Sequence, residues 1–375
     1  MSKQNELVQF SRGASGGGSK NLIVNGSCII AQRGVSSTTN GYGSVDRFQT
    51  LYNGTDEAPT QAQVDVASGT TPYTLGFRKA LKITNGNQTS GAGAADYLAI
   101  YNKIEGQDIS SSGWNVTDPN SKLTLSYWVK SSVAQTFYGR FRAFASSQYE
   151  YTYSFALSAN TWTKVTKTII GNSNFSSLLN TNALGFFHNW QCFFGTDYTN
   201  NKTLDEWAVK DNANKSPDMT STWYTTNDAT FEITGVQLEV NDTATNFEHR
   251  SFGDQLQACK RYYQVLGKHG DSSSGTNSFI GGTAILYNGS YMTCPVQLNP
   301  SMRTAPTLIS TDISNSWKFY RSNGNDSFDD FVTSGARTPY AIELANTTDI
   351  SGTQGDGGFI ESGAANAVCA VDAEL

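Results

Sequence analysis

Short runs of alternating apolar and polar residues recur along most of the chain and predict a fold built from β-strands. The alternation is strictest at 123–129 and 149–155, within strands predicted at 122–130 and 149–157, where a period of two places one face on a core and the other toward solvent or a ligand. Similar runs, separated by turn clusters such as Asn85-Gly86-Asn87, predict strands at 61–67, 78–84, 97–104, 137–145, 161–169, 184–194 and 230–240. No helical segments between these strands supply parallel crossovers, so the pattern favours an antiparallel jelly-roll β-sandwich.

One amphipathic helix interrupts the strand pattern, and we assign it to residues 252–266. Its apolar positions Phe252, Leu256, Cys259 and Tyr263 are separated by four, three and four residues, as on one face of a helix. Asp254 lies near its start and Lys260 near its end, as the helix dipole favours. A lone short helix between two β-rich regions is expected to connect two domains.

A polar, Gly- and Ser-rich stretch follows the helix and indicates a domain boundary. Beyond it, short strands are predicted at 279–287, 290–298, 307–310, 317–320, 330–333, 340–344, 358–362 and 368–373. The expected organisation is an N-terminal arm at 1–20, a jelly-roll domain at 21–251, the helix at 252–266 and a smaller β-sandwich tip domain at 267–375.

Composition and charge narrow the function classes. Only 15% of the 375 residues are charged, while aromatic residues reach 12% and there are 35 glycines, a mixture that suits strands joined by many turns. A net charge of −6 argues against nucleic acid or an anionic bilayer as the main partner. No run of about 20 apolar residues and no signal-peptide core is present, so we expect synthesis in a cytoplasm and no membrane insertion.

Residues that commonly form metal or catalytic sites are scattered. The five cysteines form no CxxC pair and are expected to be small buried residues. The three histidines, His188, His249 and His269, lack ligand spacing, and for His249 we expect a hydrogen-bonding or interface role. We therefore expect no cofactor and no metal, with calcium as an open alternative because Asp and Asn side chains are frequent in the loops.

The sequence offers little support for a catalytic function. HExxH, GxSxG and P-loop patterns are absent from the sequence. The adjacent acids Asp205-Glu206 and Asp329-Asp330 would serve a glycosidase only at a suitable carboxylate separation. The expectation is a protein that is not an enzyme.

Two sets of motifs resemble known protein families. LSYWVKSSVAQTFYGRF and ALSANTWTKVTKTI resemble the central strands of carbohydrate-binding-module-like jelly rolls. NLIVNGSCIIAQRG and GSVDRF at the start of this region, with VQLEVNDTATNFEHRSFGDQLQACKRYYQ at its end, resemble a module of bacteriophage tail-fibre and virion appendage proteins. The resemblance implies a jelly roll whose first strand pairs near its last, a helix leading to a distal domain, and a virion structural protein that is often trimeric.

Three groups of residues are candidates for function. An apolar anchor in the N-terminal arm is expected to dock on the virion, through Leu7, Val8, Phe10 and Arg12. The apolar side of the helix is expected to form the oligomer interface, through Leu256, Cys259, Tyr262 and Tyr263. Polar loops at 321–330 and 345–358 with nearby aromatic residues are expected to bind ligand, through Trp317, Tyr320, Asn323, Asn325, Asp326 and Phe328. The alternative is that the loops are only solvated and that the aromatic rings fill a small core.

The hypothesis that combines these features is a non-enzymatic tail fibre located on the virion. Its partners would be two further copies of itself, tail or capsid proteins, and a glycan or protein of the host surface. One alternative is a capsid-attached head fibre or decoration protein. Another is a stand-alone, monomeric carbohydrate-binding module that uses strand 149–155 as a sugar platform, and light scattering distinguishes a monomer from a trimer.

Overall fold

The computed structural model describes residues 20–178, 180–271, 277–322 and 324–375. The chain forms two compact units. The first comprises Met1–Cys28, Thr38–Gly41 and Phe48–His249, and the second comprises Ile29–Ser37, Tyr42–Arg47 and Arg250–Leu375. The second unit thus includes the helix together with two stretches that the sequence assigned to the jelly-roll domain.

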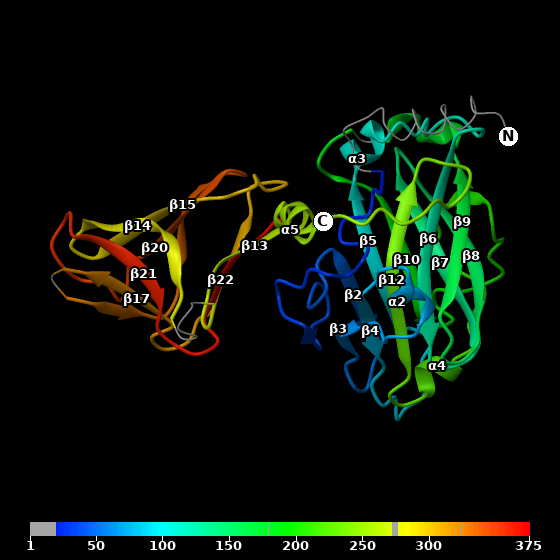
Figure 1. The fold of residues 1–375 in the computed structure, drawn as a ribbon, viewed down its shortest axis with the longest axis horizontal. Coiled ribbons are helices and arrows are strands. Elements are labelled where there is room, and N and C mark those ends of the chain that lie inside the picture. The colour runs from blue at the N-terminus through cyan, green and yellow to red at the C-terminus, as the bar shows by residue number, and fades with distance from the viewer. Residues whose placement is uncertain (1–19, 179, 272–276, 323) are drawn as a thin grey trace. The chain divides into compact units, whose positions relative to one another are not determined.

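Two antiparallel sheets form the first unit (Figure 1). Sheet A contains, in spatial order, β3 (Thr60–Asp65), β4 (Lys79–Thr84), β12 (Thr230–Glu239), β6 (Lys122–Ser131) and β9 (Thr163–Ile170). Sheet B contains, in spatial order, β11 (Trp207–Val209), β8 (Gln148–Leu157), β7 (Gln135–Phe144), β10 (Leu184–Phe194), β5 (Tyr97–Glu105) and β2 (Phe48–Asn53). The last strand of the unit, β12, lies between β4 and β6 and pairs with both.

Aromatic side chains from both sheets fill the space between them. The Tyr127 hydroxyl of β6 lies 3.0 Å from the Tyr153 hydroxyl of β8, which in turn lies 2.9 Å from Nε2 of His188 on β10. These three side chains and Trp190 are at most 1% exposed. Burial, and to a smaller degree Arg140, holds the pKa of His188 well below its usual range. Because neighbouring residues of a strand face opposite ways, the residues beside these lie on the outer faces of the sheets.

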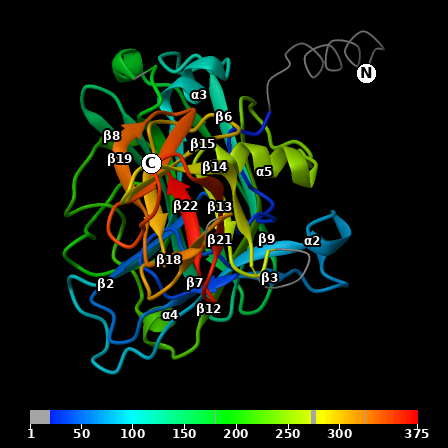
Figure 2. The same ribbon diagram turned by 90° about the vertical axis from the view of Figure 1, so that its left-hand side faces the viewer.

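Short helices complete the first unit. Helix α3 (Gly106–Ser111) and helix α4 (Thr222–Thr225) lie at opposite ends of the sandwich (Figures 1 and 2). Helix α2 (Thr71–Thr74) precedes β4, and a 3₁₀ turn, Ser173–Ser177, precedes β10. Helix α2 begins with Pro72 in its first turn, where a missing backbone N–H costs nothing.

The second unit contains helix α5 (Phe252–Lys260), whose first turn is capped by the Ser251 hydroxyl accepting from the Asp254 amide at 3.1 Å. One of its sheets contains, in spatial order, β13 (Tyr263–Lys268), β22 (Val368–Asp372) and β16 (Thr307–Ser310). The other contains β18 (Asp326–Phe328), β17 (Trp317–Arg321), β21 (Gly357–Ser362), β14 (Phe279–Asn288), β15 (Tyr291–Gln297), β20 (Ala341–Asn346) and β19 (Val332–Arg337). A two-residue strand, β1 (Ser36–Ser37), also belongs to this unit.

Two arginines from the early stretches explain why those stretches belong to the second unit. The Arg47 guanidinium lies 3.4 Å from the centre of the Tyr262 ring and forms an ion pair with Glu374. The Arg33 guanidinium lies 3.8 Å from the centre of the Tyr263 ring, and its Nη1 lies 3.4 Å from Glu374. Arg47 is only 2% exposed, so the ion pair with Glu374 offsets the cost of burying its charge. The AQRG and VDRF motifs are thus joined in space to the chain end and to the residues that follow α5.

The predicted all-β fold with one connecting helix is confirmed, and most strands lie within two residues of their expected bounds. The helix prediction was too long at its C-terminal end. Helix α5 ends at Lys260, because the residues from Tyr263 onward pair with β22 as β13. The five cysteines are free and buried as expected. None of the helices among the described residues is long and apolar enough to cross a bilayer.

Candidate functional site

The ligand-binding residues expected in the C-terminal unit do not form one exposed surface. Trp317 and Phe328 are 0% exposed and belong to the core of this unit, so their assignment to a ligand site was wrong. Side chains alternate between the two faces of a strand, and Trp317 on β17 and Phe328 on β18 both fall on the face toward the core. Tyr320 and Asp326 are half-buried and Asn325 is exposed; Asn323 lies outside the described residues.

Three of the four residues expected at the oligomer interface are buried by contacts within their own chain. Cys259, Tyr262 and Tyr263 are at most 4% exposed, and the two tyrosine rings lie against the arginines described above. Their side chains are therefore not available to a second copy, which corrects the prediction for these three. Leu256 is half-buried and remains a prediction.

Two further sequence predictions concern the virion-docking residues and the strand expected to serve as a sugar platform. The virion-docking residues Leu7, Val8, Phe10 and Arg12 lie outside the described residues. The strand expected to serve as a sugar platform in the alternative hypothesis directs Tyr151, Tyr153 and Phe155 into the core, where each is at most 7% exposed. That platform is excluded.

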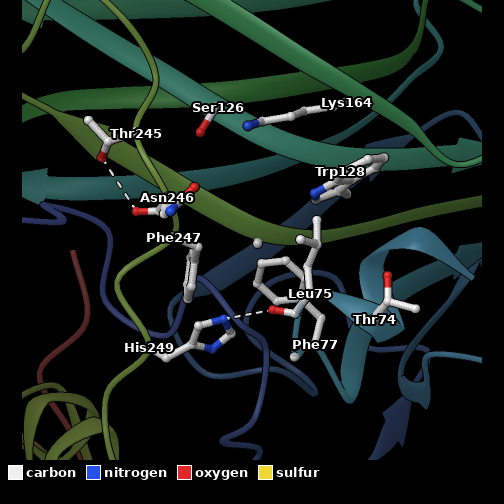
Figure 3. A pocket seen from close by; sticks show the side chains of 12 residues that line it. Thr74, Leu75, Phe77, Ser126, Trp128, Lys164, Thr245, Asn246, Phe247 and His249 are labelled. Carbon is white, nitrogen blue, oxygen red and sulfur yellow. Dashed lines mark hydrogen bonds between the residues drawn. The ribbon is translucent and has the colours of Figure 1, made fainter. Parts of the chain in front are cut away.

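A pocket with a volume of about 570 Å³ lies on the outer face of sheet A (Figure 3). It lies over β6, β9 and β12, between the turn after α2 and the segment that follows β12. Trp128 and Lys164 face it from directly paired positions on β6 and β9. The lining residues are Thr74, Leu75, Gly76, Phe77, Ser126, Trp128, Lys164, Gly235, Thr245, Asn246, Phe247 and His249.

Three rings form one wall of this pocket. The centres of the Phe77 and Phe247 rings lie 4.9 Å apart with the rings edge to face, and the His249 ring lies 4.9 Å from Phe247. His249 Nε2 lies 3.0 Å from the Leu75 carbonyl oxygen, which is the hydrogen-bonding role expected for it. Edge-to-face rings of this kind hold one another in place. The wall therefore presents aromatic surface of defined orientation.

Two glycines permit this arrangement. Gly235, at φ +62° in the irregularity of β12, lies so close to Phe77 that an added Cβ would approach the ring to 2.6 Å. Gly76, at φ +97°, lies so close to His249 that an added Cβ would come within 3.1 Å of its ring. Both positions combine a left-handed backbone with close approach of a ring, so only glycine fits without strain.

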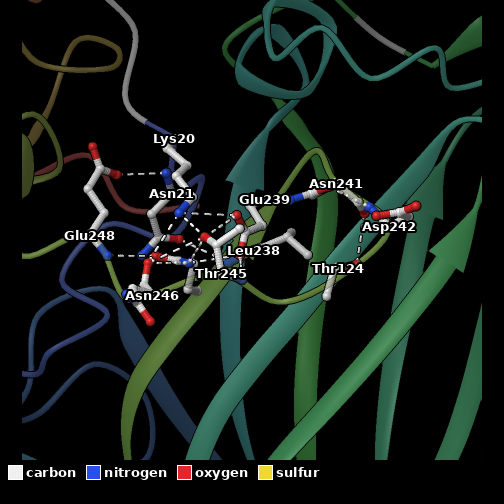
Figure 4. Close-up of polar contacts among 11 residues, drawn as sticks. Lys20, Asn21, Thr124, Leu238, Glu239, Asn241, Asp242, Thr245, Asn246 and Glu248 are labelled. Atoms are coloured by element: carbon white, nitrogen blue, oxygen red, sulfur yellow. Dashed lines mark hydrogen bonds and ion pairs between the residues drawn. The ribbon is translucent and has the colours of Figure 1, made fainter. Parts of the chain in front are cut away.

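Polar side chains on β12 hold the segment that closes the pocket (Figure 4). Glu239 accepts hydrogen bonds from the Thr245 amide at 2.9 Å and from the Thr245 hydroxyl at 2.8 Å. Gln237 accepts one from the Glu248 amide at 2.8 Å, and Lys20 forms an ion pair with Glu239 at 3.3 Å. Buried and satisfied bonds of this kind fix backbone positions. The segment bearing Asn246 and Phe247 is therefore anchored to the sheet.

The pocket offers both apolar faces and free polar groups. The side chains of Ser126, Lys164 and Asn246 line it and make no hydrogen bond with any other described residue. Trp128 is half-buried, so part of its surface remains open to the pocket. Aromatic faces combined with a few convergent polar groups bind the apolar faces and hydroxyls of a small polar molecule such as a sugar.

Sequence reasoning did not find this pocket, although one signal was present. Residues 122–130 alternate strictly, and Trp128 falls in the register of Thr124 and Ser126, on the face opposite the core. A tryptophan at a polar position of an alternating strand indicates a ring directed away from the core. The rest of the pocket depends on segments distant in sequence, which periodicity does not bring together.

No group of three or more His, Cys, Asp or Glu side chains among the described parts of the chain is arranged to hold a metal ion. None of the paired acids considered for catalysis lines the pocket. Asp205 forms an ion pair with Lys167, 2.5 Å apart, and Asp329 accepts a hydrogen bond from the Asn315 amide at 2.7 Å. These contacts assign both carboxylates structural partners.

No protein-family model and no curated protein sequence matches the chain. Among solved structures, the enzymatically active domain of tailspike protein 4 from bacteriophage CBA120 overlaps with 59% of this chain and 22% of its own length, at 12% identity and a TM-score of 0.33. A putative sugar-binding protein from Bacteroides thetaiotaomicron overlaps with 59% of this chain and 100% of its own, at 13% identity and a TM-score of 0.31. The family 11 carbohydrate-binding module of a Clostridium thermocellum cellulosomal cellulase overlaps with 58% and 98%, at 12% identity and a TM-score of 0.27. At these values the overlaps carry no argument about function.

Proposed function

We propose that the protein is a non-enzymatic virion appendage of a bacteriophage that binds a glycan of the host surface through the pocket on sheet A. The observation that carries glycan binding is the pocket itself, where Trp128 and Phe247 offer ring surface beside the free polar groups of Lys164 and Asn246. The virion role rests on the sequence motifs alone.

Binding without hydrolysis fits the chemistry of the pocket. Glycoside hydrolysis usually requires two carboxyl groups about 5–10 Å apart around the scissile bond. The pocket lining contains no Asp or Glu among the described residues. Its function is therefore recognition, and the protein releases no reducing sugar from the glycan that it binds.

The first test measures binding to purified host-surface polysaccharide by isothermal titration calorimetry. Replacing Trp128→Ala removes the open ring and is expected to weaken binding about 30-fold, corresponding to the ~2 kcal/mol typical of a binding hot spot. Asn246→Ala, at an exposed position, is expected to weaken binding without affecting the fold. Tyr340→Ala, which removes a ring that is 62% exposed in the other unit, is the matched control. Unchanged binding by both pocket variants would refute the proposal.

The virion assignment has its own test. Deleting residues 1–19, which keeps the ion pair between Lys20 and Glu239, is expected to leave a folded protein that no longer enters phage particles, because the arm carries the docking residues. Incorporation of the deletion variant at the wild-type level contradicts docking through the arm. A monomeric protein with intact glycan binding would favour the stand-alone carbohydrate-binding module.

A further inference from the structure

The outer face of sheet B carries a buried group of charges that the pocket on sheet A does not use. Arg140 and Arg142 project from β7 and Glu150 from β8, on the side away from the aromatic core. Glu150 Oε1 lies 2.6 Å from Arg140 Nη1 and 2.9 Å from Arg142 Nε. One carboxylate oxygen thus serves two guanidinium groups, and both Arg140 and Glu150 are at most 1% exposed.

Two lysines add to the positive charge. They belong to the segment between β10 and β12, which covers this face: the Thr152 hydroxyl of β8 donates to the Lys215 carbonyl oxygen at 2.8 Å. Lys202 is 8% exposed and Lys215 is half-buried. Neither ammonium group forms an ion pair with a described residue. The exposed acids Glu206 and Asp211 interact with Lys202 electrostatically, but Glu150 is the only buried acid that faces the four cations among the described residues.

Unpartnered polar atoms lie on the same face. On β10, Asn189 and Gln191 point outward with Phe187, since His188 and Trp190 point into the core. The Asn189 amide nitrogen, both polar atoms of the Gln191 side chain and Glu150 Oε2 are buried without a hydrogen-bond partner in the part of the chain described here. Both amide side chains are 0% exposed. Buried polar groups left without a partner destabilise the free protein, so this face holds unused hydrogen-bonding capacity.

Tyrosine rings surround this group of charges. Tyr101 is paired across the sheet with Asn189, and Tyr138 is paired with Gln191. The Lys215 ammonium lies 4.0 Å from the centre of the Tyr198 ring. All three rings are half-buried, so each is held by its neighbours while part of it remains accessible. Ring faces beside cations suit a sugar ring that carries a negative charge.

We propose that this face binds an acidic saccharide, with the carboxylate of a uronic acid held by Lys215, Lys202 and Arg142 and its sugar ring packed on the tyrosines. The four cations exceed the buried acid by three charges, and a bound carboxylate reduces that excess. The unpaired amide groups of Asn189 and Gln191 lie on the same face but are 0% exposed, so Lys215, Lys202 and Arg142 make the direct contacts. This site is separate from the pocket on sheet A, and either stands if the other fails.

The lowered pKa values of the two lysines also favour a negatively charged ligand. Burial, followed by the charges of Arg140 and Arg142, lowers the pKa of Lys215 to about 8. Burial also lowers the pKa of Lys202, and Arg140 contributes to that decrease. The charged forms of both lysines are thus destabilised in the free protein. A bound anion stabilises these charged forms. The overall charge of −6 makes this a local feature of the face.

The test is calorimetric titration of the full chain with trigalacturonate, with cellotriose as the neutral control and sodium sulfate as the control for a bare anion. Trigalacturonate is expected to bind and cellotriose to bind at least tenfold more weakly. Binding of sulfate as tight as that of trigalacturonate overturns the assignment to a saccharide. Absence of trigalacturonate binding overturns the site.

Variants locate the binding on this face. Lys215→Met is expected to weaken trigalacturonate binding about tenfold, because a charge-assisted hydrogen bond is lost, and Lys215→Arg is expected to restore most of it. Lys122→Met, which removes an exposed lysine of sheet A, is expected to change nothing. A thermal melt of each variant checks folding. Equal affinity of wild type and Lys215→Met, or an equal loss in Lys122→Met, contradicts the proposed site.

Discussion

In the proposed glycan site, Trp128 is expected to contribute most to binding, because it lies on a strand of the sheet and its ring points away from the core. Its neighbours on β6, Tyr127 and Val129, are 0% exposed and face the core. Alternation along the strand therefore sets the direction of the Trp128 ring independently of the loops. A ring fixed by a sheet is a more precise binding element than a ring on a loop.

His188 provides a pH-dependent prediction at the same scale. Its pKa in the folded protein lies well below the usual value, so below about pH 6.5 the unfolded chain binds a proton that the folded chain does not. The free energy of unfolding contributed by this residue is therefore constant above that pH and falls on acidification, by up to about 1.4 kcal/mol per pH unit. In urea titrations between pH 7.5 and 5.5, His188→Gln is expected to lack this part of the decrease. An identical slope in wild type and variant contradicts a neutral buried His188.

Lys215 provides a second pH prediction, with the opposite direction. Its ammonium group has a pKa of about 8, which burial and the charges of Arg140, Arg142 and Lys210 lower and the charge of Glu150 raises. As the pH rises from 7 to 9.5 the group loses its proton, and trigalacturonate affinity is expected to fall toward that of Lys215→Met. Lys215→Arg is expected to keep its affinity over this range, since guanidinium stays charged. A flat profile for the wild type would exclude Lys215 as a ligand-binding group.

At the scale of elements, the strands were predictable and their partners were not. Alternation predicted the bounds of β6 and β8 closely, because a strand with one face on the core alternates apolar and polar residues in its own sequence. The stretches Ile29–Ser37 and Tyr42–Arg47 carry no such period, and their place in the second unit depends on contacts with Tyr262 and Glu374 more than 200 residues away. The same limit hid the pocket, whose wall joins the turn after α2 to the segment after β12.

The contact between Arg47 and Glu374 gives a prediction for the second unit. Glu374→Gln removes the charge that pairs with an arginine only 2% exposed. Breaking a buried ion pair from one side costs about 3–5 kcal/mol, so the free energy of unfolding of this unit is expected to fall by that amount in urea titrations. Asp312→Asn, at an exposed position of the same unit, is the control. A loss below about 1 kcal/mol would mean that the pair contributes little.

At the scale of the whole molecule, we expect a homotrimer with α5 in its interface, on the basis of the family resemblance and the exposed apolar surface of this helix. Phe252 is 61% exposed and lies one helical turn before the half-buried Leu256, so the two form an apolar patch on α5. We expect a trimer in solution by light scattering, and we expect Leu256→Asp to dissociate it. Gln257→Asp, at the adjacent exposed position, is expected to leave the trimer intact. A trimeric Leu256→Asp variant would place the interface elsewhere.

The measurement that tests the central proposal most directly is an experimental structure of the protein bound to an oligosaccharide of the host-surface polysaccharide. The account predicts sugar density in the pocket on sheet A, with a ring packed on Trp128 and hydroxyls within hydrogen-bonding distance of Asn246 and Lys164. Density for an intact glycan at this position supports recognition without cleavage. Sugar bound only at other surfaces, with the pocket on sheet A unoccupied at saturating ligand, contradicts it.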